Sequence, residues 1–388
     1  MKPFFELLAE DRETGARAGV IHTDHGDIET PIFMPVGTQG TVKTQSTEEL
    51  LENGAQIILG NTYHLYLRPG GELIRRAGGL HRFMNWPRAI LTDSGGYQVF
   101  SLQDLRKLSA EGVRFQSHVD GSKHLFTPEN VVDIQRELGP DIMMVLDECT
   151  PYPCSYEYAR KSHELTVQWA QRARERFFQS GALHGYRQFQ FGINQGSTYP
   201  DLREKNMEEL IRLDFDGYAI GGLAVGEPKA DLYDMTEFVA ARLPKNKPRY
   251  LMGVGKPEDL VEVMARGVDM FDCVLPTRNA RNGTVFTWEG RLVLKNATYR
   301  EDFRPIDENC DCAVCRHHTR AYIRHLFSVG EVLALRLATY HNIHFYLELV
   351  RRAREAILRG EFSKFRDAFY SRYKVIEVKK QPKPIKRR

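Results

Sequence analysis

Cysteine is scarce in this chain, with six in 388 residues, and long apolar runs are missing. No segment approaches the ~20 apolar residues that a membrane-spanning helix needs. The N-terminal run Met1-Lys2-Pro3-Phe4-Phe5 reaches the charged Glu6 too soon for a secretory signal. Cys149, Cys154 and Cys273 are scattered, as expected in a compartment where thiols stay free. We therefore expect a cytoplasmic protein with no membrane-spanning segment.

A large excess of charge is also missing from most of the chain. The net charge is +3, whereas the last 18 residues contain eight lysines and arginines against the single acid Glu377. The remainder is therefore slightly acidic, which argues against a general nucleic-acid binder. The basic tail over residues 371–388 could add non-specific affinity for phosphates, or it could be a disordered solubilising end.

Three of the six cysteines stand together in the run Cys310-Asp311-Cys312-Ala313-Val314-Cys315. Thiolates this close repel one another unless a cation neutralises them, so the spacing predicts a metal site, with zinc as the first choice. Three thiolates leave one tetrahedral position open. His317 and His318 are cramped beside Cys315, whereas His341 could approach from a separate element. The remaining candidates are His325 and His344.

Apolar runs bounded by glycine, proline or acids recur eight times between residues 30 and 273. Amphipathic segments with helix-start signals, such as Thr127-Pro128-Glu129 and Lys256-Pro257-Glu258, lie between them. Strands of this kind alternating with helices predict an α/β fold with a parallel sheet, closed as a (β/α)8 TIM barrel. The predicted strands are 32–36, 56–59, 89–92, 141–146, 189–193, 217–220, 249–252 and 268–271. Short β-like runs before residue 30 predict an N-terminal antiparallel β cap.

Polar residues follow the predicted strands, at the edge where such a barrel carries its active site. Asp93 follows the third strand, Asp147 the fourth and Asp272 the eighth, while Gln195 stands just past the fifth. One aspartate in such a place could simply cap a helix. Four polar residues at one edge indicate a site. No predicted strand ends in histidine, which argues against a metal-dependent barrel hydrolase and places the metal outside the chemistry.

Carboxylate chemistry is what these strand ends offer. A carboxylate nucleophile with a second carboxyl as acid/base is suited to exchange at an anomeric carbon. Aspartate and glutamine side chains, with backbone amides from Gly221-Gly222, can read the edge of a heterocycle. Tyr97 could stack on such a ring, or it could be a packed loop aromatic.

Longer motifs surround these residues, namely Asp93-Ser94-Gly95-Gly96-Tyr97-Gln98, Asp147-Glu148-Cys149-Thr150-Pro151, Gly221 to Glu227, Met252 to Gly255 and Asp269 to Arg278. Together they resemble the tRNA-guanine transglycosylases, specifically the bacterial members, over about residues 15–370 with the cysteine run included. The resemblance implies a (β/α)8 barrel with a zinc-binding insertion after strand eight, in agreement with the strand count.

The resemblance also implies a reaction, in which guanine at the anticodon wobble position of tRNA is replaced by a 7-deazaguanine. Asp272 matches the family nucleophile, which would attack C1′ of the ribose and form a covalent RNA intermediate. Asp93 matches the general acid/base, which would protonate the departing guanine and then deprotonate the incoming base.

Recognition of the base is implied in the same way. Asp147 and Gln195 match the residues that bind the purine edge, and Tyr97 with Met252 would enclose the ring. The substrate-binding residues implied are Asp93, Ser94, Gly95, Gly96, Tyr97, Asp147, Cys149, Gln195, Gly222, Leu223 and Met252.

Cys149 and Val225 fit the bacterial pattern, which is suited to the compact 7-aminomethyl-7-deazaguanine, preQ1. The eukaryotic type has a glycine at the position of Val225 and admits the bulkier queuine. Two alternatives are therefore a queuine-inserting enzyme and a non-catalytic RNA-binding subunit. Asp93 and Asp272 are both present, which disfavours the second.

RNA contacts are implied for two stretches, a loop just after the nucleophile and a segment after strand seven. Their residues are Thr277, Arg278, Asn279, Ala280 and Arg281, and Gly253, Val254, Gly255, Lys256, Pro257, Glu258 and Asp259. A plain solvated basic loop is the alternative for the first. The partners implied are tRNA with an anticodon starting guanine-uridine, guanine, preQ1 and a second copy in a homodimer.

The resemblance selects His341 as the fourth metal ligand beside Cys310, Cys312 and Cys315, for one structural Zn²⁺ per subunit. The predicted domains are a cap over 1–30, a barrel over 31–290 and 345–370, a zinc-binding subdomain over 291–344 and the tail over 371–388.

Overall fold

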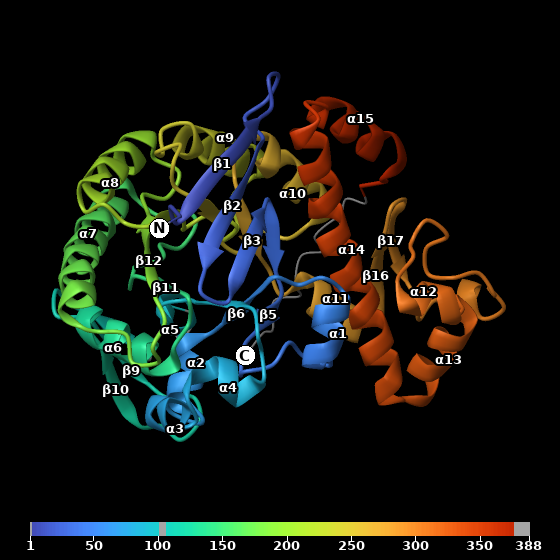
Figure 1. Cartoon of the computed structure of the whole chain (residues 1–388), viewed down its shortest axis with the longest axis horizontal. Coiled ribbons are helices and arrows are strands. Elements are labelled where there is room, and N and C mark those ends of the chain that lie inside the picture. The colour runs from blue at the N-terminus through green and yellow to red at the C-terminus, as the bar shows by residue number, and fades with distance from the viewer. Residues whose placement is uncertain (1, 101–105, 376–388) are drawn as a thin grey trace, which may run out of the picture.

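A ring of parallel strands surrounded by helices forms the centre of the protein (Figure 1). The computed structural model describes residues 2–100 and 106–375, so most of the predicted basic tail lies outside the described residues. The barrel strands are β4 (Ile32–Met34), β5 (Val36–Gly37), β6 (Ile57–Gly60), β7 (Ala89–Thr92), β11 (Ile142–Met144), β12 (Phe189–Asn194), β13 (Gly217–Ile220), β14 (Arg249–Leu251) and β15 (Met270–Asp272). The predicted α/β barrel is confirmed.

The first predicted strand is split in two, and its halves close the ring. β4 pairs with β15, placing Met34 opposite Asp272, while β5 pairs with β6, placing Val36 opposite Leu59. Pro35 stands between the halves and has no N–H to donate, so it interrupts the ladder there. Closure of the ring therefore runs through one interrupted strand, whose first half pairs with the last barrel strand and whose second half pairs with the next.

Helices alternate with the barrel strands as the sequence predicts. α6 begins at a capping box in which the Thr127 hydroxyl accepts from the Asn130 N–H at 3.1 Å, and α10 begins at Pro257. The helices up to the eighth strand are α1 (Thr47–Glu52), α2 (Thr62–Leu67), α3 (Gly71–Arg76), α4 (Gly79–Met84), α5 (Gly96–Phe100), α6 (Pro128–Leu138), α7 (Tyr156–Gln179), α8 (Pro200–Arg212), α9 (Lys229–Ala240) and α10 (Pro257–Ala265). No helix within the described ranges has the length and hydropathy that crossing a bilayer requires.

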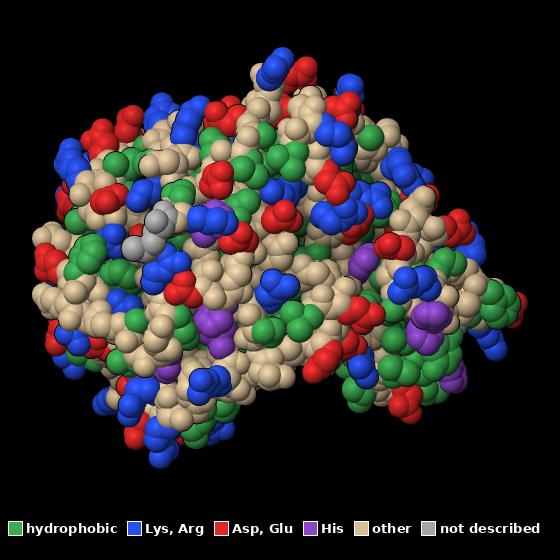
Figure 2. Space-filling view, viewed as in Figure 1, with side chains coloured by type: hydrophobic (Ala, Val, Ile, Leu, Met, Phe, Trp, Pro, Cys, Tyr) green, Lys and Arg blue, Asp and Glu red, His purple; other side chains and the backbone are tan. Residues whose placement is uncertain are grey.

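The antiparallel cap closes the end of the barrel where the strands begin. It has three strands, β1 (Phe5–Glu10), β2 (Arg17–Thr23) and β3 (Gly26–Thr30). Arg17 forms two 2.8 Å bonds with the buried Asp269 just before β15, and Phe4 stacks on Phe189 at the start of β12. Figure 2 shows this face with acidic and basic side chains interspersed, without a broad area of one sign.

A three-stranded antiparallel sheet, β8 (Arg106–Leu108), β9 (Val113–Gln116) and β10 (Lys123–Phe126), is inserted between β7 and α6. This sheet was not expected from the sequence. After the barrel come α11 (Leu275–Arg281), the hairpin β16 (Thr284–Thr287) and β17 (Gly290–Val293), the short 3-10 helix Ala297–Tyr299, α12 (Ala313–His317), α13 (Arg320–Val329), α14 (Val332–Leu358) and α15 (Phe362–Arg372). A second, smaller apolar core lies between the hairpin and α12 to α14.

α14 joins several parts of the molecule. His341 from this helix faces the cysteine run, and Tyr346 donates to the Gly255 carbonyl after β14. Near its other end, Arg354 donates to the carbonyls of Gly19 and Thr30 in the cap. The predicted domain boundary between residues 344 and 345 lies inside this continuous helix, and the division of the chain into domains stays a prediction.

Candidate active site and metal centre

A cavity of about 350 Å³ opens where the barrel strands end. Its volume is at the lower end of the range for small-molecule sites. Three aspartates from different strands face it together with an amide, as the strand ends predict. Its lining is formed by Val36, Thr38, Leu59, Asn61, His64, Asp93, Ser94, Tyr97, Gln98, Asp147, Cys149, Gln195, Gly221, Gly222, Leu223, Ala224, Val225, Tyr250, Met252, Gly253, Asp272, Cys273 and Val274.

Asp93 follows β7 and is buried in a set of hydrogen-bond donors. Its Oδ2 accepts from Asn61 at 2.5 Å and from Gln98 at 2.8 Å, while its Oδ1 accepts from the Thr62 N–H at 2.8 Å. Burial raises the pKa of Asp93 to about 6 against the opposing effect of these bonds. The carboxyl can therefore hold or release a proton near neutral pH.

Asp147 and Gln195 form a pair on another wall of the cavity. Gln195 Nε2 donates to Asp147 Oδ2 at 2.7 Å, and the Ser94 hydroxyl donates to Asp147 Oδ1 at 3.3 Å. Burial raises the pKa of Asp147 to about 6. The pair presents a carboxylate acceptor and an amide, the groups that read the edge of a heterocycle.

Two of the predicted glycines are required by close approach. A Cβ on Gly96 would come within 3.0 Å of Asp147 Oδ1, and one on Gly222 would meet Gln195 Oε1 at 2.3 Å. Gly222 also has φ +65°, a conformation that favours glycine. Gly95 and Gly96 lie behind the cavity rather than in its lining, and their N–H groups donate to Asp93 and Ser94.

Asp272 is the last residue of β15 and faces the cavity. Its Oδ1 accepts from the Tyr250 hydroxyl at 2.6 Å and from the Gly253 N–H at 2.8 Å. Within residues 2–100 and 106–375 both bonds fall on this one oxygen, so Oδ2 stays available to the cavity. Burial raises the pKa of Asp272, and the two bonds oppose that effect.

Asn61 and Tyr250 hold two of the aspartates and were not predicted from the sequence. Asn61 follows β6 directly, so its place at a strand end was a signal that could have identified it. Tyr250 lies within β14 and reads as an ordinary apolar strand residue, so its contact with Asp272 had no sequence signal. Glu227 was quoted only within a motif, yet its carboxylate accepts from the N–H groups of Ala224, Val225 and Gly226 on the cavity wall.

The two predicted RNA-binding stretches differ in which of their side chains are exposed to solvent. The stretch after Asp272 is helix α11 rather than the expected loop, because residues 275–281 continue into a helical turn with Pro276 in its first turn. Arg278 is exposed at the helix surface and Arg281 is half-buried. The predicted contacts of this stretch could therefore come from Arg278, whereas Thr277 and Ala280 are buried.

In the second stretch only Gly253 and Lys256 are exposed. Glu258 and Asp259 are nearly buried and pair with Lys229, at 3.2 Å and 2.7 Å from its Nζ. Val254, Gly255 and Pro257 are buried as well. Any contact with RNA would therefore involve the first part of this stretch and not its acidic residues.

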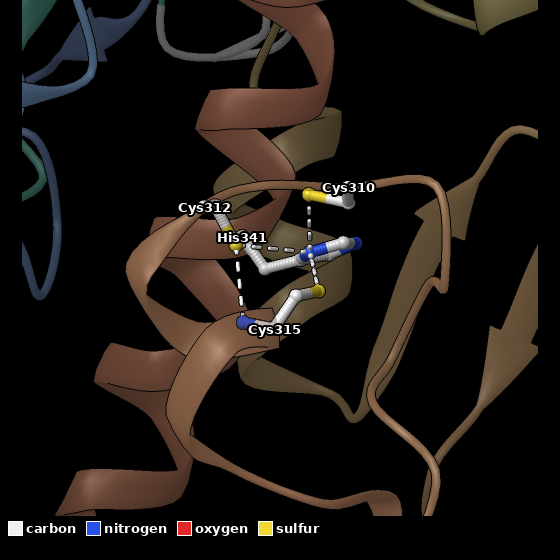
Figure 3. Close-up of side chains that lie close together, drawn as sticks. All are labelled: Cys310, Cys312, Cys315 and His341. Carbon is white, nitrogen blue, oxygen red and sulfur yellow. Dashed lines mark hydrogen bonds between the residues drawn. The ribbon is translucent and has the colours of Figure 1, made fainter.

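The cysteine run and His341 form a compact metal-binding group (Figure 3). His341 Nδ1 lies 3.8, 3.6 and 3.3 Å from the sulfurs of Cys310, Cys312 and Cys315. Tetrahedral zinc with Zn–S near 2.3 Å and Zn–N near 2.0 Å would separate these atoms by about 3.5 Å. His341 Nε2 donates to the Phe286 carbonyl at 2.8 Å, which leaves Nδ1 as the ligand atom.

The other candidate histidines are not part of this group, although His344 also approaches Cys310. His317 and His325 are exposed, and His344 bonds Asn53 and Asp311 at 3.2 and 3.1 Å. The metal group shares no residue with the lining of the cavity, in agreement with a metal outside the chemistry.

His25, His81 and Asp141 form a second cluster at the opposite end of the barrel. The two imidazoles stack with ring centroids 3.5 Å apart, and His25 Nδ1 lies 2.7 Å from Asp141 Oδ1. Stacked rings direct their nitrogens side by side rather than at one point, so this is a hydrogen-bonded group. It connects the cap to the barrel.

The family model described as queuine tRNA-ribosyltransferase matches residues 11–375. The queuine tRNA-ribosyltransferase of Desulforudis audaxviator is 60% identical over 365 residues, covering 94% of this chain and 97% of its own. Those of Thermoanaerobacter pseudethanolicus and Bacillus subtilis are 58% and 56% identical, each covering 95% of this chain and 97% and 96% of their own length.

Replacing Asp147 by asparagine should stabilise the ligand-free protein. A carboxyl whose pKa is raised to about 6 favours folding below its ordinary value near 4 and loses that contribution as pH rises through 6. Asp147→Asn removes this loss, so the free energy of unfolding at pH 7.5 should increase by about 2 kcal/mol, and by much less at pH 4.5. Urea denaturation at pH 4.5 and pH 7.5 measures this free energy of unfolding, and Asp234→Asn, at an exposed position, is the control. A destabilised variant at pH 7.5 would contradict the assignment.

Proposed function

The chain belongs to the queuine tRNA-ribosyltransferase family, and we propose that it replaces guanine at the wobble position of tRNA anticodons with preQ1. Membership makes it a tRNA-modifying enzyme. The observation that carries the finer proposal is that Asp93 and Asp272 face one cavity beside the Asp147–Gln195 pair. A nucleophile, an acid/base and a reader of purine edges are then all present in one place.

The first half of the exchange would begin at Asp272. Its free Oδ2 attacks C1′ of the ribose, and the C1′–N9 bond breaks with its electron pair passing to guanine. Asp93, whose pKa is near 6, donates the proton that makes guanine a neutral leaving group. Tyr250 and the Gly253 N–H hold Asp272 through Oδ1, so the attacking oxygen points into the cavity.

The second half would reverse these roles. The incoming base loses a proton to the Asp93 carboxylate and attacks C1′, which releases Asp272 unchanged. Asp147 would accept from the ring N–H and amino group of the base, while Gln195 and the Gly222 N–H would donate to its carbonyl oxygen. Tyr97, which is 56% exposed, and Met252 lie on the cavity wall and would enclose the ring.

The metal-binding group fits a structural zinc. Three thiolates and one imidazole, at separations of a tetrahedral site and with the imidazole held by a backbone carbonyl, are the donors that Zn²⁺ prefers. When bound, the ion would neutralise the crowded thiolates and hold α12 against α14. Action on tRNA in the cytoplasm and assembly as a homodimer are further parts of the proposal.

Asp272→Asn should abolish exchange of labelled guanine into tRNA, by at least about 10⁴-fold, because an amide cannot act as the nucleophile. Covalent tRNA–protein adducts that survive denaturing electrophoresis should disappear with it. Binding of tRNA should change by less than about twofold. The exposed Asp234→Asn provides a matched control. Exchange by the Asp272 variant at the rate of the control would disprove the nucleophile assignment.

The size of the base pocket should select preQ1 over queuine. Val225 lines the cavity and Cys149 is buried in its wall, so a bulky substituent on the base has little room. The unaltered protein should incorporate labelled preQ1 with a kcat/KM at least about tenfold above that for queuine. Val225→Gly should lower this ratio, because a smaller side chain leaves more room for queuine. Efficient incorporation of queuine by the unaltered protein would favour the queuine-inserting type.

Removal of zinc should weaken the fold without removing a catalytic group. Metal analysis should find one zinc per chain, and Cys312→Ser should lose it with a fall in melting temperature of about 5–15 °C. At temperatures where this variant stays folded, the KM for tRNA should rise more than kcat falls. Cys154→Ser, outside the metal group, should retain zinc. A zinc-free variant that is folded but lacks all turnover at saturating tRNA would refute a structural role.

A further inference from the structure

Arg203 is a fully buried cation directly behind the base-binding wall. It lies in the first turns of α8 with no exposed surface, and within residues 2–100 and 106–375 its guanidinium donates to oxygens of neutral groups alone. Nε binds the Ser197 carbonyl at 2.7 Å and Nη1 binds the Asn194 side chain at 3.0 Å. Nη2 binds the Gly221 carbonyl at 2.9 Å.

No carboxylate of the described residues forms an ion pair with Arg203, in contrast to the equally buried Arg17, which pairs with Asp269. Burial lowers the pKa of Arg203 to about 10, so it remains a cation at neutral pH. A buried charge without a counter-ion is costly, and its field extends into the neighbouring cavity.

The Gly221–Gly222 peptide lies between this charge and the cavity and is polarised by it. In a trans peptide the C=O and the N–H point in opposite directions. The Gly221 carbonyl points at Arg203, so the Gly222 N–H points away from it, toward the cavity that Gly222 lines. Among the described residues no acceptor binds this N–H. A peptide whose carbonyl accepts from a cation is polarised, which makes its N–H a stronger donor.

The same guanidinium also fixes the end of the neighbouring strand β12, which presents Gln195. It binds both the backbone and the side-chain oxygen of Asn194, and Asn194 immediately precedes Gln195. Asn206 accepts from the Gln195 N–H and from the Asn194 amide, at 3.1 Å each. Arg203 therefore spans the ends of β12 and β13, the two strands that present Gln195 and Gly222.

We propose that Arg203 is a positioning residue for base exchange, which aims and polarises the Gly222 N–H toward the carbonyl oxygen of the bound base. This inference rests on the proposed function. When the C1′–N9 bond breaks, its electron pair enters the purine ring and part of the charge collects on that oxygen. The polarised N–H stabilises the departing base more than the bound substrate, and such donors contribute mainly to kcat.

The test uses guanine and 6-thioguanine, which differ only in the acceptor that the Gly222 N–H would bind. Arg203→Met should lower kcat/KM for guanine exchange about 100-fold. Calorimetry with the full-length variant should show that the ratio of its dissociation constants for 6-thioguanine and guanine falls about tenfold relative to the unaltered protein. The KM of the variant for tRNA should stay within about twofold. Arg203→Lys keeps the charge, so its kcat/KM and its base preference should lie between those of the unaltered protein and of Arg203→Met.

Arg136→Met is the matched control, because Arg136 is also buried, donates to the carbonyls of Phe177 and Ser180 and lies outside the cavity lining. It should lose stability but keep the preference between the two bases. An unchanged preference in Arg203→Met, or the same change in Arg136→Met, overturns the proposal. If Arg203→Met does not fold, Arg203→Lys decides, because an ammonium has three donors and lacks the planar fork with which the guanidinium binds Ser197, Asn194 and Gly221. An unchanged preference in Arg203→Lys overturns the proposal too.

The proposed function and the positioning role of Arg203 can be disproved separately. If the unaltered protein does not exchange labelled guanine into tRNA, the proposed function is wrong. If it does so and the Arg203 variants behave like the control, only the role of Arg203 is wrong.

Discussion

Closure of the barrel between β4 and β15 is the contact on which the rest of the structure depends. Asp272 is itself a member of that pairing, opposite Met34, so the residue proposed to attack the ribose is positioned by the ladder that completes the ring. In a closed parallel barrel every strand ends at the same edge. Asp93, Asp147, Gln195 and Asp272 therefore meet at one cavity, although nearly 180 residues separate the first from the last.

The site combines groups that would destabilise a protein with no use for them. Burial raises the pKa of all three aspartates, and the donors around them are amides, hydroxyls and backbone N–H groups rather than cations. Neutral donors orient a carboxylate without permanently cancelling its charge. The fully buried guanidinium of Arg203, behind the base-binding wall, binds backbone carbonyls and the Asn194 side chain instead. Charge is thus held close to where the reaction would need it, and the cost is met by the large apolar core of the barrel.

The features that could be predicted from the sequence are those set by neighbouring residues, and the features that were missed depend on residues far apart in the chain. The eight strands and their polar ends were predictable because apolar runs and turn residues are local signals. The sheet β8–β10 was missed because its strands are only three or four residues long. β9 alternates apolar and polar residues, but over too short a run to stand out from the polar sequence around it. Tyr250 was missed because its role depends on a neighbouring strand. Cysteine spacing predicted a metal site, but His341 could be chosen only through the family resemblance, since its orientation is fixed by Phe286, 55 residues away. The loop expected at residues 277–281 came from the family resemblance and was wrong, because these residues belong to helix α11, whose first turn contains Pro276.

α14 gives the metal centre a wider influence than its size suggests. One helix of 27 residues, about 40 Å long, carries a metal ligand, holds the segment after β14 and fastens the cap. A helix cannot melt at one place and stay fully ordered a few turns away without losing the packing that stabilises it. The chain therefore lacks an autonomous metal-binding module that could come loose while the barrel persists. The metal-binding group, the barrel and the cap belong to a single cooperative unit, whose local openings are coupled through this helix.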